Sequence, residues 1–205
     1  MCSIIGSYDA NEVKMLASLN AYRGQHSHSM AVVNDGAPMS LKRGLGALPA
    51  EEIDTLPKGF IICHQQAPTT DARDVSSIHP AAFMSCLLWH NGIIKDKQIK
   101  QWQNQYGDLQ PWDTAWLVKL IAENGFDILS EVDGTFACVY NNGDHTYMFR
   151  NANSPLFRRG ATISSTKFEG SSPIKPGQVY MLENGDWEET PYTFTTKEQF
   201  FWTPA

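Results

Sequence analysis

The first six residues, Met1-Cys2-Ser3-Ile4-Ile5-Gly6, decide how the rest of the chain is interpreted. Ile4 and Ile5 predict a buried strand, and Cys2 follows an initiator methionine that is readily trimmed when the next side chain is small. A terminal cysteine joins a thiol nucleophile to an α-amine with a reference pKa of about 7.7–8.0, which can accept the thiol proton. The alternative is that Cys2 is an incidental small residue at the start of a strand. The order of the motifs downstream favours the nucleophile.

Composition sets broad limits on the protein. The length of 205 residues predicts a single domain spanning residues 1–205. A net charge of −6 and a pI near 5.4 argue against nucleic-acid binding. No apolar run is long enough to span a membrane, and the sequence lacks a secretory signal, so we expect a cytoplasmic protein. No cofactor is predicted.

The cysteines and histidines give little sign of a metal or of disulfides. Cys63, Cys86 and Cys138 lie in apolar, strand-like segments and are expected to be buried free thiols in a reducing compartment. His26 and His28 lie close together, but no third ligand is near them in the sequence, so we predict no metal site.

Apolar stretches of strand length flank two helical regions. This pattern predicts a layered α/β protein with a largely antiparallel sheet. Asn91-Gly92 is a typical turn dipeptide, so a hairpin at this point is the structural interpretation of that pair. The expected strands are 3–8, 30–33, 59–64, 83–89, 135–140, 147–150, 161–165 and 179–183, and the expected helices are 11–22, 97–107, 115–124 and 127–132, with a helical turn at 50–54.

Several short motifs follow one another in an order that resembles the class II glutamine amidotransferases, the N-terminal-nucleophile hydrolases with a terminal cysteine. The opening hexamer is similar to M-C-G-I-x-G, with serine where glycine is usual. Residues 23–27 are similar to R-G-x-D-S, with histidine for aspartate, and residues 90–94 match H-N-G-x-I closely. Residues 64–69 are similar to H-x-R-x-x-T, and residues 113–114 stand where the family has S-D-T. Residues 150–156 are similar to R-D…P-L, and residues 174–177 are similar to the family's proline-glycine turn.

The resemblance implies an α+β fold, a four-layer αββα sandwich of two antiparallel sheets. It also implies a glutaminase that forms a thioester on Cys2 and releases glutamate and ammonia. The side-chain amide of Asn91 and the backbone N–H of Gly92 would form the oxyanion hole. Asp113 would hold the substrate α-ammonium, and Arg23 would brace the terminal cysteine from behind.

Position 66 departs from the family pattern. The arginine expected to pair with the substrate α-carboxylate is replaced by Gln66, which carries no charge. Three interpretations remain open. In the first, Gln66 with Thr69 suffices and glutamine binds more weakly. In the second, Arg73 reaches the α-carboxylate from the same loop, and in the third the substrate is another γ-glutamyl amide or the site is inactive.

The sequence ends at Ala205 and leaves no room for a synthetase domain, so we expect any ammonia to reach an acceptor enzyme in trans. The first hypothesis is therefore a glutamine amidotransferase domain that serves such a partner. The second is a γ-glutamyl amide hydrolase that needs no partner. The third is a catalytically weak subunit kept for binding.

Overall fold

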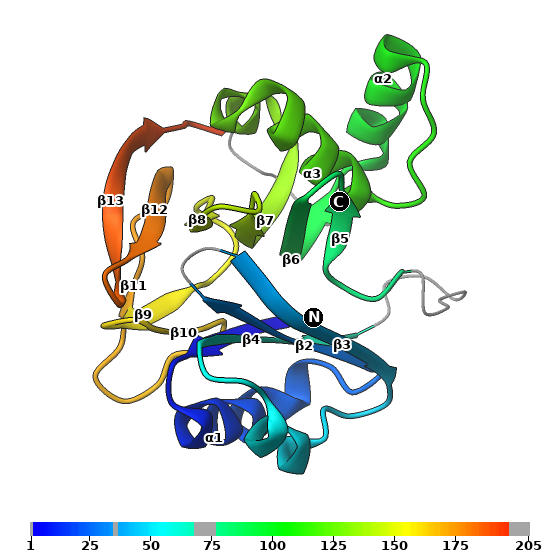
Figure 1. Ribbon diagram of the computed structural model, residues 1–205. Helices are drawn as coiled ribbons and strands as arrows, with labels where there is room; N and C mark the ends of the chain where they lie inside the picture. Colours follow the sequence, from blue (N-terminus) through cyan, green and yellow to red (C-terminus); the bar gives the residue numbers. More distant parts are fainter. Residues whose placement is uncertain (1, 35–36, 68–76, 197–205) are drawn as a thin grey trace, which may run out of the picture.

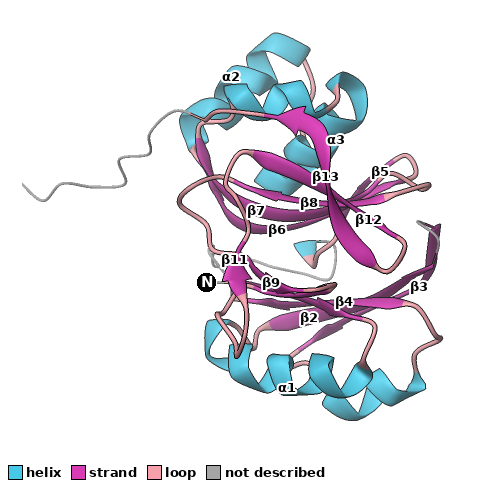
Figure 2. Ribbon diagram, turned by 90° about the vertical axis from the view of Figure 1, so that its left-hand side faces the viewer, coloured by secondary structure: helices cyan, strands magenta, loops and turns pink. Residues whose placement is uncertain are grey.

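The computed structural model describes residues 2–34, 37–67 and 77–196. Two antiparallel sheets face each other, and helices cover their outer faces (Figures 1 and 2). The α+β fold is thus a four-layer αββα sandwich, as the family resemblance implied.

The first sheet carries the N-terminus. Its strand order is β11-β9-β10-β1-β4-β2-β3, so β1 lies near the middle and pairs antiparallel with β4 and β10. The strands are β1 Ser3–Ser7, β2 Ser27–Asn34, β3 Ala37–Leu45, β4 Phe60–Gln66, β9 Phe157–Arg159, β10 Thr162–Ser164 and β11 Ser172–Pro173.

The second sheet has the order β13-β12-β8-β7-β6-β5 and contributes the strand with the H-N-G-x-I motif. The strands are β5 Ala81–Phe83, β6 Cys86–Ile94, β7 Gly134–Asn141, β8 Thr146–Arg150, β12 Gln178–Glu183 and β13 Asp186–Thr193.

Helices form the two outer layers (Figure 2). Helix α1, Ala10–Asn20, covers the first sheet and is capped by the Asp9 side chain, which accepts a hydrogen bond from the Asn11 N–H. Helices α2, Asp96–Tyr106, and α3, Asp113–Asn124, cover the second sheet. Short 3₁₀ helices span Ala21–Arg23, Ala50–Thr55 and Phe126–Glu131. Among the described helices, none is long and apolar enough to cross a membrane.

Strand alternation divides the buried apolar side chains of the described residues into three cores. In β1, Ile5 packs toward α1, whereas Ile4 packs between the two sheets. In β6, Trp89 packs between the sheets, whereas Leu88 and Ile94 face α3. Because β1 and β6 both turn side chains into the middle layer, residues next to these positions can meet there.

Two expectations about local structure were wrong. Strand β6 runs straight through Asn91 and Gly92, which pair with β7 and make no hairpin turn. The expected 115–124 helix also differs: α3 begins at Asp113, and its N-cap residue Trp112 makes no side-chain capping bond. The Asp113 carboxylate therefore stands at the first turn of α3.

Candidate active site

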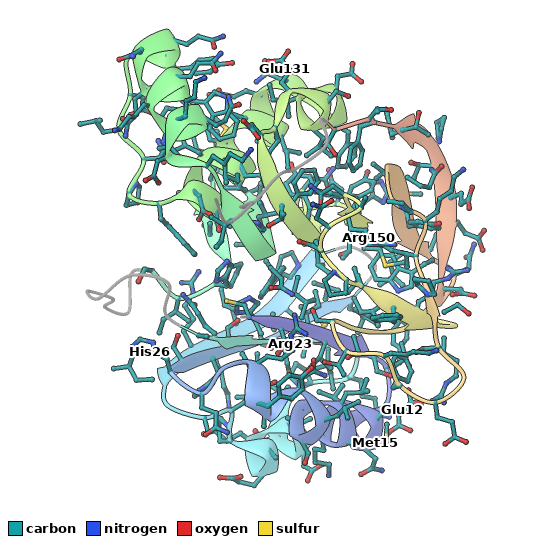
Figure 3. The ribbon with its side chains drawn as sticks, turned by 180° about the vertical axis from the view of Figure 1, so that it is seen from behind. Glu12, Met15, Arg23, His26, Glu131 and Arg150 are labelled. Carbon is teal, nitrogen blue, oxygen red and sulfur yellow. The ribbon has the colours of Figure 1, made fainter. Side chains whose placement is uncertain are left out.

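Cys2 stands immediately before β1, close to β4. Its Sγ lies 3.7 Å from the carbonyl oxygen of Ala67, and 9 % of the residue is exposed. Arg23, from the turn after α1 (Figure 3), is buried, and its Nε donates a 2.9 Å hydrogen bond to the Cys2 carbonyl. The Arg23 guanidinium is thus bonded to the main chain of Cys2.

Asn91 connects β6 to the strand that follows Cys2. Its Nδ2 lies 3.3 Å from Ser165 Oγ, and the same oxygen accepts a 2.9 Å hydrogen bond from the Ile4 N–H. Asn91 is buried on the inner face of its sheet, like its neighbour Trp89. One hydroxyl therefore fixes the distance between the Asn91 amide and β1.

The surroundings of Gly92 leave no room for a side chain at this position. A Cβ at this position would lie 1.9 Å from the Thr135 carbonyl oxygen and 2.7 Å from His90 Nε2. The opposing residue Phe136 directs its C=O and N–H to Asn151, at 2.9 and 3.2 Å. Gly92 and Phe136 are thus a non-hydrogen-bonded pair, and the Gly92 N–H points away from β7.

Asp113 lies on that same outer edge of β6. Its Oδ2 accepts a 3.3 Å hydrogen bond from the N–H of Ile94, two residues after Gly92 on the strand. Its Oδ1 accepts a 2.8 Å hydrogen bond from the Thr114 N–H. The side chain is 27 % exposed, so the carboxylate keeps access to a ligand while two backbone donors fix its direction.

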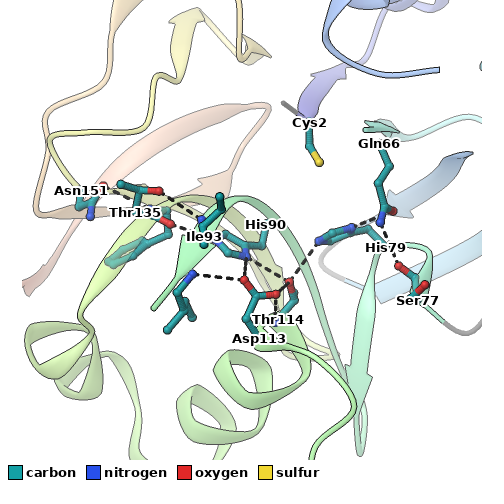
Figure 4. Close-up of polar contacts among 12 residues, drawn as sticks. Cys2, Gln66, Ser77, His79, His90, Ile93, Asp113, Thr114, Thr135 and Asn151 are labelled. Carbon is teal, nitrogen blue, oxygen red and sulfur yellow. Dashed lines mark hydrogen bonds and ion pairs between the residues drawn. The ribbon is translucent and has the colours of Figure 1, made fainter. Parts of the chain in front are cut away.

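Gln66 is fully buried, and both ends of its amide have protein partners (Figure 4). Nε2 donates to the Ser77 carbonyl at 3.1 Å, and Oε1 lies 3.2 Å from His79 Nδ1. Its role is therefore to hold a histidine. Thr69 and Arg73, named with Gln66 as candidate substrate ligands, lie outside the described residues.

A hydrogen-bonded chain of side chains continues from Gln66 into the second sheet (Figure 4). His79 Nε2 lies 3.2 Å from Thr114 Oγ1, which lies 3.1 Å from His90 Nδ1. His90 Nε2 lies 3.1 Å from the Thr135 carbonyl, and Nδ1 lies 4.0 Å from Asp113 Oδ2. We call Gln66, His79, Thr114 and His90 the histidine relay.

The sequence analysis did not identify His79 as a site residue. His79 is buried between two rings, 4.1 Å from the His64 ring centroid and 4.6 Å from that of Trp112. The available signal was the His79-Pro80 dipeptide leading into β5, which is typical of a turn and carries no mark of chemistry.

This arrangement of layers, with a cysteine before a central strand of one sheet and an Asn-Gly pair on the facing sheet, is the fold of class II glutamine amidotransferase domains. The glutamine phosphoribosylpyrophosphate amidotransferase from B. subtilis, solved with ADP and GMP, superposes with a TM-score of 0.70 at 18 % identity. An allosteric regulatory enzyme of purine biosynthesis superposes at 0.67 and 19 % identity. The matches cover 92 % and 95 % of this chain, which spans about half the length of those proteins.

A third similar structure has almost the same extent as this chain. It is a glutamine aminotransferase class-II domain protein from Silicibacter pomeroyi, with a TM-score of 0.54 and 13 % identity over 94 % of this chain and 99 % of that one. No protein-family model matches the sequence, and no curated protein matches it significantly. At these identities the similarity establishes the fold.

Proposed function

We propose that this chain is a glutaminase of the class II amidotransferase type, with Cys2 as its nucleophile. The Cys2 sulfur attacks the γ-carboxamide carbon of glutamine, and the α-amine, reached through a water, takes the thiol proton and passes it to the departing ammonia. Water then cleaves the thioester and releases glutamate. In this proposal the ammonia passes to an acceptor enzyme in trans.

The proposal rests on one observation: donors suited to an oxyanion lie where β6 faces β1. The Asn91 amide is tied through Ser165 to the Ile4 N–H, two residues after Cys2. The pairing of β6 with β7 turns the Gly92 N–H toward the edge that carries Asp113. Preorganised donors of this kind typically contribute about 10²–10³ in rate each.

The substrate end of the proposal uses Asp113. Its carboxylate is partly exposed and oriented by the N–H groups of Thr114 and Ile94, so it suits an α-ammonium group. Arg23 fixes the Cys2 carbonyl and so limits rotation of the nucleophile. Thr69 and Arg73 remain proposed ligands for the α-carboxylate.

A second candidate is a γ-glutamyl amide hydrolase. Gln66 favours it, because this uncharged side chain is buried and uses its amide on Ser77 and His79. A substrate whose α-carboxylate is masked or absent would not need an ion pair at that position.

A substrate assay with matched cysteine variants tests the proposal. The purified chain is incubated with glutamine and, separately, with γ-glutamyl amides, and glutamate and ammonia are measured. We expect glutamine hydrolysis that Cys2→Ala abolishes and Cys63→Ala retains, because Cys63 faces α1 in the core. Intact mass should show a chain lacking Met1, with one adduct on Cys2 after treatment with a glutamine-derived electrophile.

Three results would count against the proposal. Activity in Cys2→Ala equal to wild type rules out the nucleophile, and an active chain that keeps Met1 rules out the amine as the base. Hydrolysis of γ-glutamyl amides without hydrolysis of glutamine favours the second candidate.

A further inference from the structure

Helix α1 has apolar side chains on two opposite faces. Val13, Leu16 and Ala17 face inward and pack in the core beneath the first sheet. Met15 (Figure 3) and Leu19 lie on the outer face, four residues apart, and are 52 % and 40 % exposed. Because a surface helix normally turns polar side chains to solvent, this second apolar face indicates a contact surface.

A groove of about 800 Å³ runs along the outer face of α1. Its other wall is the loop between β10 and β11, residues 165–171, which contributes the ring of Phe168. The Arg159 guanidinium lies 5.3 Å from the centre of that ring, pairs with Glu12 of α1 and donates a 2.9 Å hydrogen bond to the Glu169 carbonyl. The two walls are therefore held together by Arg159, and the groove is formed within a single chain.

The loop runs antiparallel to α1. Its beginning lies beyond the end of the helix, because the Thr166 hydroxyl is 3.2 Å from that of Tyr22. Its end lies beside the first turn, because Arg159 bonds both Glu12 and the Glu169 carbonyl. Positions along the loop can therefore be assigned to the two ends of the groove.

The charges at the two ends of the groove are opposite. Lys167 lies toward the C-terminal end of α1, whereas Glu169 and the cap residue Asp9 lie toward its N-terminal end. Lys167 and Glu169 are exposed, and no ion pair among the described residues includes either side chain. The groove thus has an apolar middle, one basic end and one acidic end.

We propose that this groove is the interface of a two-fold dimer, in which the α1 helices of two copies of the chain pack antiparallel. Met15 and Leu19 of each copy enter the groove of the other. Lys167 faces the partner's Glu169, and the two-fold axis repeats this pair. A surface that is its own complement is what such an axis requires, and antiparallel helices also align their dipoles favourably.

Other occupants fit this groove less well. An anionic lipid surface would meet the carboxylates of Asp9 and Glu169 and a chain with a net charge of −6. A helix from an unrelated protein would need an apolar pair flanked by opposite charges, a pattern that α1 and its loop already have. Because α1 covers the outer face of the first sheet (Figure 1), the dimer leaves the middle layer open, and the inference does not depend on the glutaminase function.

Sedimentation equilibrium over a wide range of concentrations tests the dimer, with a matched pair of methionine variants. Met15→Asp places a charge in the interface twice per dimer, so the dissociation constant should rise at least about tenfold. Met39→Asp is the control, because Met39 is 53 % exposed on β3, and it should leave the constant unchanged. Circular dichroism shows that each variant is folded. A wild-type chain that stays monomeric throughout, or a folded Met15→Asp that dimerises normally, would overturn the proposal.

Charge reversal tests the antiparallel arrangement. Lys167→Glu places two carboxylates opposite each other, and Glu169→Lys does the same with two ammonium groups, so each variant alone should dimerise more weakly than wild type. An equal mixture of the two variants restores opposite charges at both contacts, and heterodimers should form about as tightly as the wild-type dimer. Variants that dimerise normally alone, or a mixture that associates no better than its components, would contradict the pairing of Lys167 with the partner's Glu169.

Discussion

The two ends of the candidate site are built by different means. Around Cys2, the groups are fixed to main-chain atoms: Arg23 bonds the Cys2 carbonyl, and Ser165 bonds the Ile4 N–H. Around Gln66, the contacts join side chain to side chain across two sheets and α3. The first end is thus held by the main chain, whereas the second depends on the positions of side chains.

This difference separates the nucleophile from the substrate end. Strand pairing sets where Asn91 and Gly92 stand. The relay depends on how the two sheets and α3 pack, and His90 lies 4.0 Å from Asp113. We therefore expect changes at the nucleophile end to alter the rate and changes in the relay to alter substrate affinity.

Thiol reactivity should show the largest contrast at the nucleophile end. Burial raises the pKa of the Cys63 thiol to about 12, and the pKa of Cys138 is also raised. At about pH 8 a thiol with a pKa of about 12 is roughly a thousandfold less ionised than an ordinary thiol of pKa about 8.5.

Iodoacetamide at about pH 8, followed by peptide mass spectrometry over time, measures this contrast. Cys2 should be modified first, and the peptides with Cys63 and Cys138 should stay unmodified in the native protein. In denaturant all of them should react at similar rates, which serves as the control. Native labelling of Cys63 as fast as Cys2 would remove the distinction.

Asn91→Ala should produce the next largest effect. If its amide meets the developing oxyanion, kcat falls by about 10²–10³ while KM changes little. Ser165→Ala is the matched control, since it removes the contact to Asn91 but keeps the amide donor. We expect a smaller loss of kcat there, with some loss of stability because the Ile4 N–H loses its partner. A normal kcat in Asn91→Ala with a lowered Tm would make Asn91 a structural residue.

The sequence predicted the parts of the molecule that local patterns determine. Buried strands such as β4 and β7 followed from apolar runs, and the four-layer fold was implied by the family resemblance that the order of the motifs carries. Edge strands β3 and β13 were missed, because most of their residues are exposed and Pro38 and Pro191 interrupt the pattern.

For the site, the sequence motifs contained His90 and Thr114 without indicating what they do. Their connection depends on His79, which lies 13 residues from Gln66 and 35 from Thr114 in the chain. The relay ends at two carbonyls, those of Ser77 and Thr135, and no sequence pattern gives their positions. The relay could therefore be recognised only in the folded structure.

The smallest expected effect concerns residue 66, at the other end of the site. Gln66→Arg replaces an uncharged amide by a guanidinium, which can donate to the Ser77 carbonyl and also carries a positive charge. A hydrogen bond to a charged group contributes about 1.5–3 kcal/mol, against about 1 kcal/mol for a neutral one.

We expect Gln66→Arg to lower the glutamine KM several-fold, because about 1.4 kcal/mol corresponds to a tenfold change in affinity. Gln66→Met is the uncharged control. It removes the amide that bonds Ser77 and His79, so KM should rise about tenfold. The glutamine KM of each variant, with thermal melting to show that each is folded, checks both outcomes. A folded Gln66→Arg protein whose KM is unchanged or higher would show that residue 66 does not face the substrate α-carboxylate, and the γ-glutamyl amide hydrolase would then be the better candidate.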